Sequence, residues 1–171
     1  MDTADLRTLQ APLKQRYRDD PDAALVTLEA SGSLGEGISC SVDSGRALAA
    51  AGLHPASGGD GSLLCSGDML LEALAACAGV TLRAVAGSLG ITVAGGRVLA
   101  EGDLDFRGTL GVDKEAPVGF REVRLRFELD TDAGEEDLAT LLRLTERYCV
   151  VLQTLARPPV LSAGIAGSAG A

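Results

Sequence analysis

The chain has 171 residues, of which 46% are hydrophobic and only 3% aromatic; this excludes a disordered protein and indicates one domain with a core of Leu, Val and Ala. Its net charge of −9 argues against nucleic acid or an anionic membrane as a partner, because both would repel it. No basic segment followed by a hydrophobic one comes after Met1, so we expect no secretory signal and a cytoplasmic protein.

Residues 1–23 form a polar leader. Leu6, Leu9 and Leu13 recur at helical spacing among charged residues, and Pro21 ends the pattern. The pattern fits a short amphipathic helix that docks on the protein body or on a partner subunit. A frayed terminal segment fits it equally well.

Segments with β-strand composition follow the leader. Residues 25–30 are rich in Val, Thr and Leu, and residues 31–35 have the composition of a turn. Residues 38–43 then alternate between apolar and polar side chains, with Cys40 on the apolar side. These segments predict an antiparallel hairpin that buries Cys40. Residues 46–51 fit a third strand or a helical turn.

The most hydrophobic stretch of the chain runs from Ser66 to Gly90. Ser66 or Asp68 is suited to cap the first helical turn, and Gly90 favours the left-handed conformation that ends a helix. The residues between them are mostly Leu, Ala, Val and Met, which predicts a long helix buried on several sides. Glu72 and Arg83 fall inside it, and both would be costly in lipid. We therefore predict a core helix rather than a membrane span.

Two strands and a second helix complete the pattern. Residues 98–107 and 123–130 alternate between apolar and charged side chains, which is typical of an antiparallel sheet with one solvated face. The helix that follows has an acidic first turn and an apolar stripe that includes Cys149, and Pro158 ends it. The final segment, 162–171, consists of small residues and indicates a flexible tail.

The chain has four cysteines, and their spacing excludes a zinc site. No CxxC pair is present, and His54 is the lone histidine, so no metal centre is expected. In a reducing compartment the cysteines are free thiols. Cys77 lies in the middle of the predicted core helix, where a thiol is more often a small hydrophobic residue than a nucleophile. Its position alone does not establish a function.

Two segments resemble the cysteine motifs of a known family. Residues 70–82, Leu-Leu-Glu-Ala-Leu-Ala-Ala-Cys-Ala-Gly-Val-Thr-Leu, look like the first cysteine helix of the osmotically inducible protein C (OsmC) and organic hydroperoxide resistance (Ohr) proteins. Residues 148–155, Tyr-Cys-Val-Val-Leu-Gln-Thr-Leu, are similar to the family's second motif. Gly58-Gly59 before the helix and residues 90–93 after it fit as well. The resemblance covers residues 24–161 as one OsmC-like domain.

The resemblance implies both a fold and an activity. The fold is α+β, with an antiparallel sheet packed around a long central buried helix in an intertwined homodimer. The activity is thiol-dependent reduction of organic hydroperoxides, without a metal, haem or flavin cofactor. Cys77 matches the attacking cysteine and Cys149 the resolving one, and the reductant is a small dithiol or a lipoylated protein. The chemistry needs two thiols, because a thiolate attacks the O–O bond and the resulting sulfenic acid must be trapped before further oxidation.

The sequence departs from the family's peroxidases near the attacking thiol. Those enzymes hold it with an arginine of the early hairpin and an acidic residue at the start of the cysteine helix. Asp68 is the acidic candidate here, because residue 67 is Gly. The hairpin turn has no arginine, which leaves Arg46 and Arg83 as candidates. The residue after the second cysteine is Val150, where the family has Pro.

These departures place the chain in a less characterised branch and keep two functions open. The first is a peroxidase that uses Cys77 and Cys149, in which Cys40 and Cys65 have no catalytic part. The second is a non-enzymatic dimer with inert cysteines that binds an apolar ligand or a protein partner. Oxidation of two thiols per chain by a hydroperoxide would distinguish the first function from the second.

Overall fold

The computed structural model describes residues 31–34, 39–43, 48–111 and 113–165, together with Thr8, Gln15 and Asp19. These three residues of the leader are helical. The rest of the leader, segment 25–30 and Arg46 lie outside the described residues. The described elements are, in chain order, β1 (Ser31–Leu34), β2 (Ser39–Asp43), β3 (Leu48–Gly52), the 3-10 turn η2 (Pro55–Ser57), β4 (Leu64–Cys65), α2 (Ser66–Leu89), β5 (Gly95–Leu104), α3 (Phe106–Thr109), β6 (Phe120–Asp130), α4 (Glu135–Tyr148) and α5 (Val150–Ala156).

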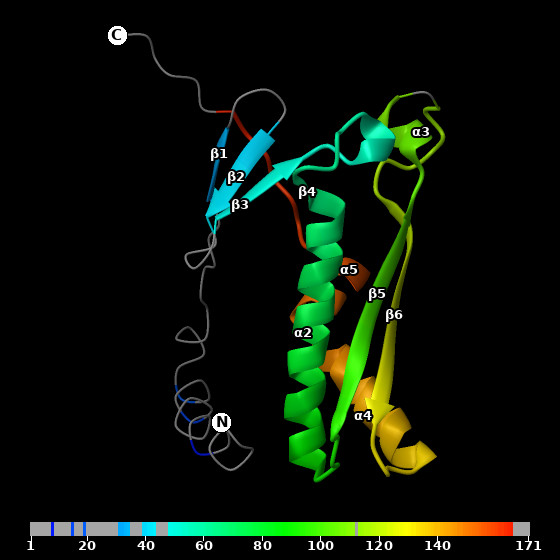
Figure 1. Cartoon of the computed structure of the whole chain (residues 1–171). Coiled ribbons are helices and arrows are strands. Elements are labelled where there is room, and N and C mark those ends of the chain that lie inside the picture. Colours follow the sequence, from blue (N-terminus) through cyan, green and yellow to red (C-terminus); the bar gives the residue numbers. More distant parts are fainter. Residues whose placement is uncertain are drawn as a thin grey trace.

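The small sheet at the start of α2 has the order β1-β2-β3-β4 (Figure 1). Its first pairs are antiparallel, and β3 pairs with β4 in parallel. The prediction of a turn at residues 31–35 was wrong for Ser31–Leu34, which pair with residues 40–43. Ser and Gly favour turns, but the backbone hydrogen bonds of a neighbouring strand override that local preference. Residues 48–52 form a strand, which answers the question left open at residues 46–51.

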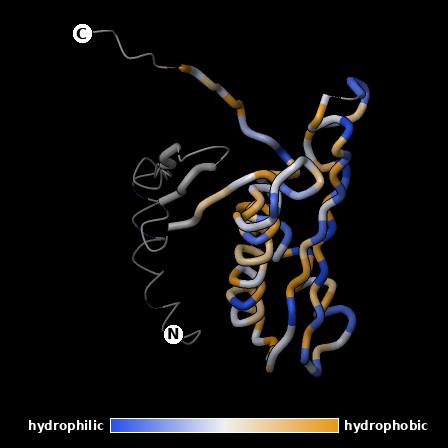
Figure 2. Tube along the Cα trace, turned by 45° about the horizontal axis from the view of Figure 1, so that its top comes forward, coloured by the Kyte–Doolittle hydropathy of each residue, from blue (hydrophilic) through white to orange (hydrophobic). Residues whose placement is uncertain are grey.

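The long strands β5 and β6 form a separate antiparallel ribbon. Val98 lies opposite Phe127, and half-buried and exposed side chains alternate along most of β6. Figure 2 shows the same alternation of hydrophilic and hydrophobic residues along both strands. On the outer face Arg124 donates a hydrogen bond of 2.8 Å to Asp103. The predicted sheet with one solvated face is therefore confirmed, and its inner face packs against α2. The prediction of a strand over residues 105–107 was wrong, because Asp105 caps the short helix α3 there.

Helix α2 begins directly after β4 and ends at a glycine. Its N-cap is Cys65, which makes no side-chain capping bond, so the predicted cap at Ser66 or Asp68 was wrong. Because the chain turns from β4 straight into the helix, both residues already lie within the first turn. The predicted end is confirmed: Gly90 has a φ of 74°, and its N–H bonds to the carbonyl of Ala86.

The chain covers only one side of α2. The buried residues of the helix form a single stripe against β5, α4 and α5, made of Leu74, Ala78, Leu82, Val85 and Ala86. On the opposite side Ala73 and Ala76 are exposed, and Val80 is 72% exposed. The expected burial on several sides is therefore not provided by the described part of one chain. Among those residues α2 is also the helix long and apolar enough to cross a membrane, by length and composition alone.

The second predicted helix is two helices. The chain breaks at Cys149, whose φ of −72° and ψ of 107° are extended. The N–H of Cys149 still bonds to the Thr145 carbonyl at 2.9 Å, and its own carbonyl accepts from Gln153 at 2.9 Å. The break therefore changes the direction of the chain, although Cys149 itself keeps a backbone hydrogen bond on each side. Both α4 and α5 lie against α2.

Candidate active site

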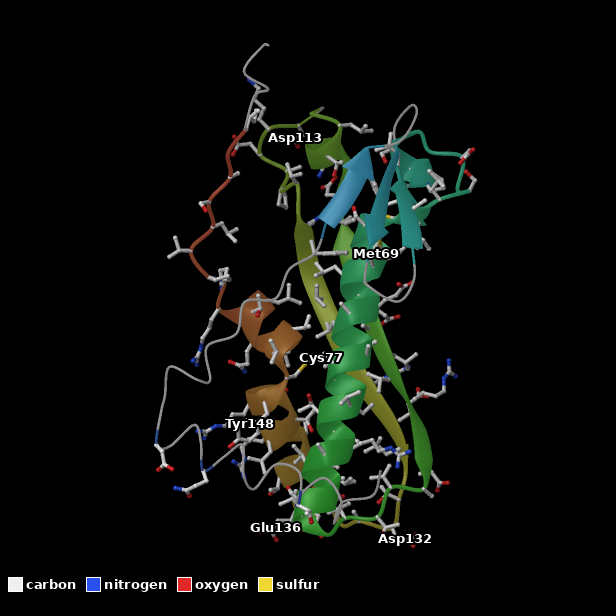
Figure 3. All side chains as sticks on the ribbon, turned by 90° about the vertical axis from the view of Figure 1, so that its left-hand side faces the viewer. Met69, Cys77, Asp113, Asp132, Glu136 and Tyr148 are labelled. Carbon is white, nitrogen blue, oxygen red and sulfur yellow. The ribbon has the colours of Figure 1, made fainter. Side chains whose placement is uncertain are left out.

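The fold brings together two cysteines that are far apart in the sequence. Cys77 lies in the middle of α2, and Cys149 lies at the junction of α4 and α5. Figure 3 shows the sulfur of Cys77 between α2 and this junction. Cys149 is 0% exposed, whereas Cys77 is half-buried. Both are free thiols, and Cys77 packs against the buried cluster of Leu74, Ala78 and Cys149.

The surroundings of Cys77 favour its thiolate. Burial acts to raise its pKa, but hydrogen bonds donated to the sulfur outweigh burial, so the pKa of Cys77 lies below its ordinary value. The donors are the backbone N–H groups of Val151 and Val150, the Cys149 thiol and the Thr81 hydroxyl. The two backbone donors belong to the first turn of α5, where N–H groups have no partner within the helix. The break at Cys149 thus directs free N–H groups at the reactive sulfur.

The second thiol has the opposite tendency. Burial raises the pKa of Cys149, and the neighbouring Cys77 sulfur raises it further, while the backbone N–H groups of Leu152 and Val151 act in the other direction. Cys77 is therefore the thiol that loses its proton first, and Cys149 stays protonated beside it. The pair is chemically unequal: one member is the stronger nucleophile and the other a proton-bearing neighbour.

Apolar side chains form the walls around the pair. Leu74, Ala78 and Cys149 make a buried cluster, and Cys77 packs against it. The ribbon and α5 add further apolar groups, namely Val98, Ala100, Val123, Leu125, Phe127, Val151 and Leu152. An alkyl group gains free energy by entering such surroundings, at about 0.8 kcal/mol per buried CH₂. Among the described residues no cluster of His, Cys, Asp and Glu could hold a metal ion.

Residues 59–163 match the family model of OsmC-like proteins. The chain belongs to the OsmC-like protein family. No curated protein matches the sequence. The matched residues include both cysteines and end close to the predicted domain boundary at residue 161, although the boundaries themselves stay predictions.

Solved structures of OsmC-like proteins have the same fold. An OsmC-like protein from Mycoplasma pneumoniae is 20% identical, with a TM-score of 0.66 over 78% of this chain and 89% of that one. An organic hydroperoxide resistance protein from Legionella pneumophila is 19% identical, with a TM-score of 0.62 over 78% and 92% of the two chains. One from Bacillus subtilis is 17% identical, with a TM-score of 0.52 over 79% and 94%. At these identities the likeness shows the fold alone.

The two charged candidates that the structure of this OsmC-like protein describes, Asp68 and Arg83, lie away from the thiol pair. Asp68 is exposed and precedes Cys77 by nine positions, which is about 13.5 Å along a helix axis. It lines a surface pocket beside Cys65 at the start of α2. Arg83 donates instead to the carbonyl of Val93. A catalytic part for Asp68 requires a group that bridges to the sulfur, and it stays a prediction.

Thr81 is the residue that the sequence analysis missed. It follows Cys77 by four positions, so the two side chains share a face of α2. Side chains of a helix lean toward its N-terminus, which directs the Thr81 hydroxyl back over the turn that holds the thiol. The spacing was visible in the sequence. The sequence alone does not single out Thr81, because one hydroxyl in an apolar helix has no evident partner until the fold is known.

We predict that Thr81→Val raises the pKa of Cys77, because it keeps the side-chain shape and removes a hydrogen bond to the thiolate. The rate of alkylation by iodoacetamide should fall about threefold at a pH below the pKa, the effect of a bond worth about 0.7 kcal/mol. At a pH above the pKa of Cys77 in both wild type and Thr81→Val, the two alkylation rates should converge. The plot of rate against pH for the variant therefore moves to higher pH. Thr81→Ser keeps the hydroxyl and should behave like wild type. Superimposable profiles for wild type and the valine variant would contradict this.

Proposed function

We propose that this OsmC-like protein is a cysteine-based peroxidase that reduces organic hydroperoxides. The proposal rests on one observation: the half-buried Cys77 packs against the buried cluster that holds Cys149. The pKa of Cys77 is lowered and that of Cys149 is raised, which fits the two roles. Family membership, together with structural neighbours named organic hydroperoxide resistance proteins, supports a redox role. Cys77 would attack the peroxide, and Cys149 would resolve the product.

The proposed cycle has three steps. The Cys77 thiolate attacks the terminal oxygen of ROOH, the O–O bond breaks, and the alcohol ROH leaves after taking up a proton; Cys77 becomes a sulfenic acid. Cys149 then attacks the Cys77 sulfur, the S–O bond breaks, and the oxygen leaves as water with the thiol proton. A dithiol reductant, small or carried as a lipoyl group on a protein, finally exchanges with the disulfide and restores both thiols.

The apolar walls favour an alkyl hydroperoxide over hydrogen peroxide. We therefore expect faster consumption of cumene hydroperoxide than of hydrogen peroxide at equal concentration, with dithiothreitol as the reductant. Released cumyl alcohol should match the peroxide lost, and turnover should continue until the reductant is exhausted. Absence of consumption above that of dithiothreitol alone would overturn the proposed function.

The exposed side of α2 supports a homodimer as part of the proposal. Three exposed apolar residues, Ala73, Ala76 and Val80, share one face of the helix opposite the buried stripe. A run of apolar side chains on a surface marks a contact site. Cys77 lies between this face and the buried stripe, so a second subunit placed there would also cover the approach to the thiol.

We predict that Val80→Asp weakens the dimer, since it places a carboxylate in an apolar contact. The dissociation constant should rise at least about tenfold, which corresponds to about 1.4 kcal/mol. Sedimentation velocity at micromolar concentration measures it. Val160→Asp is the matched control, because it adds the same charge at a side chain that is fully exposed after α5. A wild-type chain that sediments as a monomer would contradict the dimer.

A second candidate is a binding protein for apolar ligands. A hollow of about 420 Å³ lies between α2, α4 and β6, with a predominantly leucine lining that includes Leu129, Leu138 and Leu142. An apolar hollow of this kind accepts small hydrophobic molecules without thiol chemistry. Titration of free thiols before and after cumene hydroperoxide separates the candidates: loss of two thiols per chain favours the peroxidase, and no loss favours the binder.

A further inference from the structure

Thr145 carries a buried hydroxyl that nothing in the described chain satisfies. Its side chain is 0% exposed, and its Oγ1 has no hydrogen-bond partner within residues 31–34, 39–43, 48–111 and 113–165. A hydroxyl taken out of water without a partner costs free energy. Valine has nearly the same shape and would avoid this cost. The hydroxyl therefore calls for an explanation beyond the packing of α4.

The usual role of a threonine inside a helix does not apply here. Such a residue ordinarily donates to the carbonyl four positions earlier, as the Thr154 hydroxyl of α5 does to Val150 at 2.8 Å. The Thr145 hydroxyl makes no such bond. Threonine is also a poorer helix former than the leucines around it. Neither local hydrogen bonding nor helix propensity accounts for its presence.

Thr145 lies next to the thiol pair. The Cys149 N–H bonds to its carbonyl, so Thr145 lies in the last turn of α4 directly before the break at Cys149. One turn earlier Leu141 packs against Leu82 and its neighbours, and one turn later Cys149 packs against Ala78. Helices α2 and α4 run in opposite directions (Figure 1). The Thr145 side chain therefore falls opposite the turn of α2 that follows Cys77.

The proposed reaction adds a polar atom to this apolar site. Attack on a hydroperoxide leaves one oxygen on the Cys77 sulfur, and a sulfenic acid both donates and accepts hydrogen bonds. The packed walls from β5 and β6 are apolar and offer that oxygen no side-chain partner. The Thr81 hydroxyl already acts on the Cys77 sulfur, whose pKa it lowers. That of Thr145 is unpaired.

We propose that the Thr145 hydroxyl binds the oxygen that a hydroperoxide leaves on Cys77, an inference that rests on the proposed peroxidase function. Its O–H donates to the sulfenic oxygen once that atom has arrived. When Cys149 attacks the Cys77 sulfur, the S–O bond breaks and negative charge develops on the departing oxygen. The Thr145 donor stabilises that charge until the oxygen takes the proton of Cys149 and leaves as water. Thr145 itself is unchanged by the step.

The test compares Thr145→Val with Thr145→Ser. The valine variant should form the sulfenic acid at close to the wild-type rate but resolve it at least about tenfold more slowly, as expected for a lost donor to a departing oxygen. Dimedone trapping at intervals after one equivalent of cumene hydroperoxide measures the sulfenic acid lifetime, and intact mass measures the sulfinic product. The serine variant keeps the hydroxyl and should resemble wild type. Thr140→Val removes another hydroxyl of α4 and serves as the control.

Thermal unfolding supplies a second readout. Thr145→Val should unfold at the same temperature as wild type or higher, because it removes a buried unpaired hydroxyl. A lower unfolding temperature would show that the hydroxyl already has a partner, such as a buried water, and would overturn the inference. If wild type consumes hydroperoxide and the sulfenic acid lives equally long in Thr145→Val and in wild type, the inference is overturned as well. If wild type consumes none, the inference falls together with the proposed function, and that result is distinct from the other two.

Discussion

Cys77→Ser is expected to abolish hydroperoxide consumption, with a loss of about a thousandfold or more. A serine hydroxyl at neutral pH is protonated and far less nucleophilic than a thiolate, and it cannot form a sulfenic acid. The hydrogen bonds that lower the pKa of Cys77 would then act on an atom that does not ionise. Cumene hydroperoxide loss in the presence of dithiothreitol measures the effect.

Cys65→Ser is the matched control for this loss. Cys65 is also half-buried, but it is the N-cap residue before α2 and lines the surface pocket beside Asp68. Its replacement should leave turnover within a few-fold of wild type. Equal losses in the two variants would mean that the assignment of the attacking thiol is wrong.

Cys149→Ser should separate attack from resolution. This variant keeps the attacking thiol, so it should consume one equivalent of peroxide and then stop, because no second thiol traps the sulfenic acid. Further peroxide should drive Cys77 to sulfinic or sulfonic acid, seen as a gain of about 32 or 48 Da by intact mass. Wild type should instead lose about 2 Da, the mark of a disulfide.

The apolar-ligand candidate predicts a different set of masses. With inert cysteines, wild type and both single variants should keep their masses at modest peroxide concentration. If Cys77→Ser and Cys149→Ser both consumed peroxide as fast as wild type, neither thiol would be the catalyst. The family membership would then describe the fold only.

Long periodic segments were predictable from the sequence. The alternation from residue 123 to 130 repeats over enough residues to fix both the strand and its buried face, and β6 has both as predicted. The apolar stretch that ends at Gly90 likewise fixed a helix and its C-cap, because a left-handed residue after an apolar helix is a strong local signal. The same patterns predicted that a helix with Cys77 comes before the two strands and that a helical segment with Cys149 comes after them.

The arrangement that makes the site reactive was not predictable. The apolar stripe through Leu141, Cys149 and Leu152 continues without Gly or Pro until Pro158, so periodicity favours one unbroken helix. The break at Cys149 depends on how α4 and α5 pack against α2, and it frees the N–H groups of residues 150 and 151. The sequence pattern instead suggested charged residues as the groups that activate the thiol. Of these, Asp68 lies nine positions before Cys77 on α2. Backbone donors leave no signal in side-chain composition.

The most direct test of the account is to locate the disulfide after oxidation. The folded protein is treated with one equivalent of cumene hydroperoxide, alkylated, digested without reduction and analysed by mass spectrometry. We predict that one linked pair dominates, joining the peptides of Cys77 and Cys149, while Cys40 and Cys65 are recovered as alkylated thiols. Free thiols at both Cys77 and Cys149, or a disulfide that joins either of them to a different cysteine, would contradict the proposed redox pair.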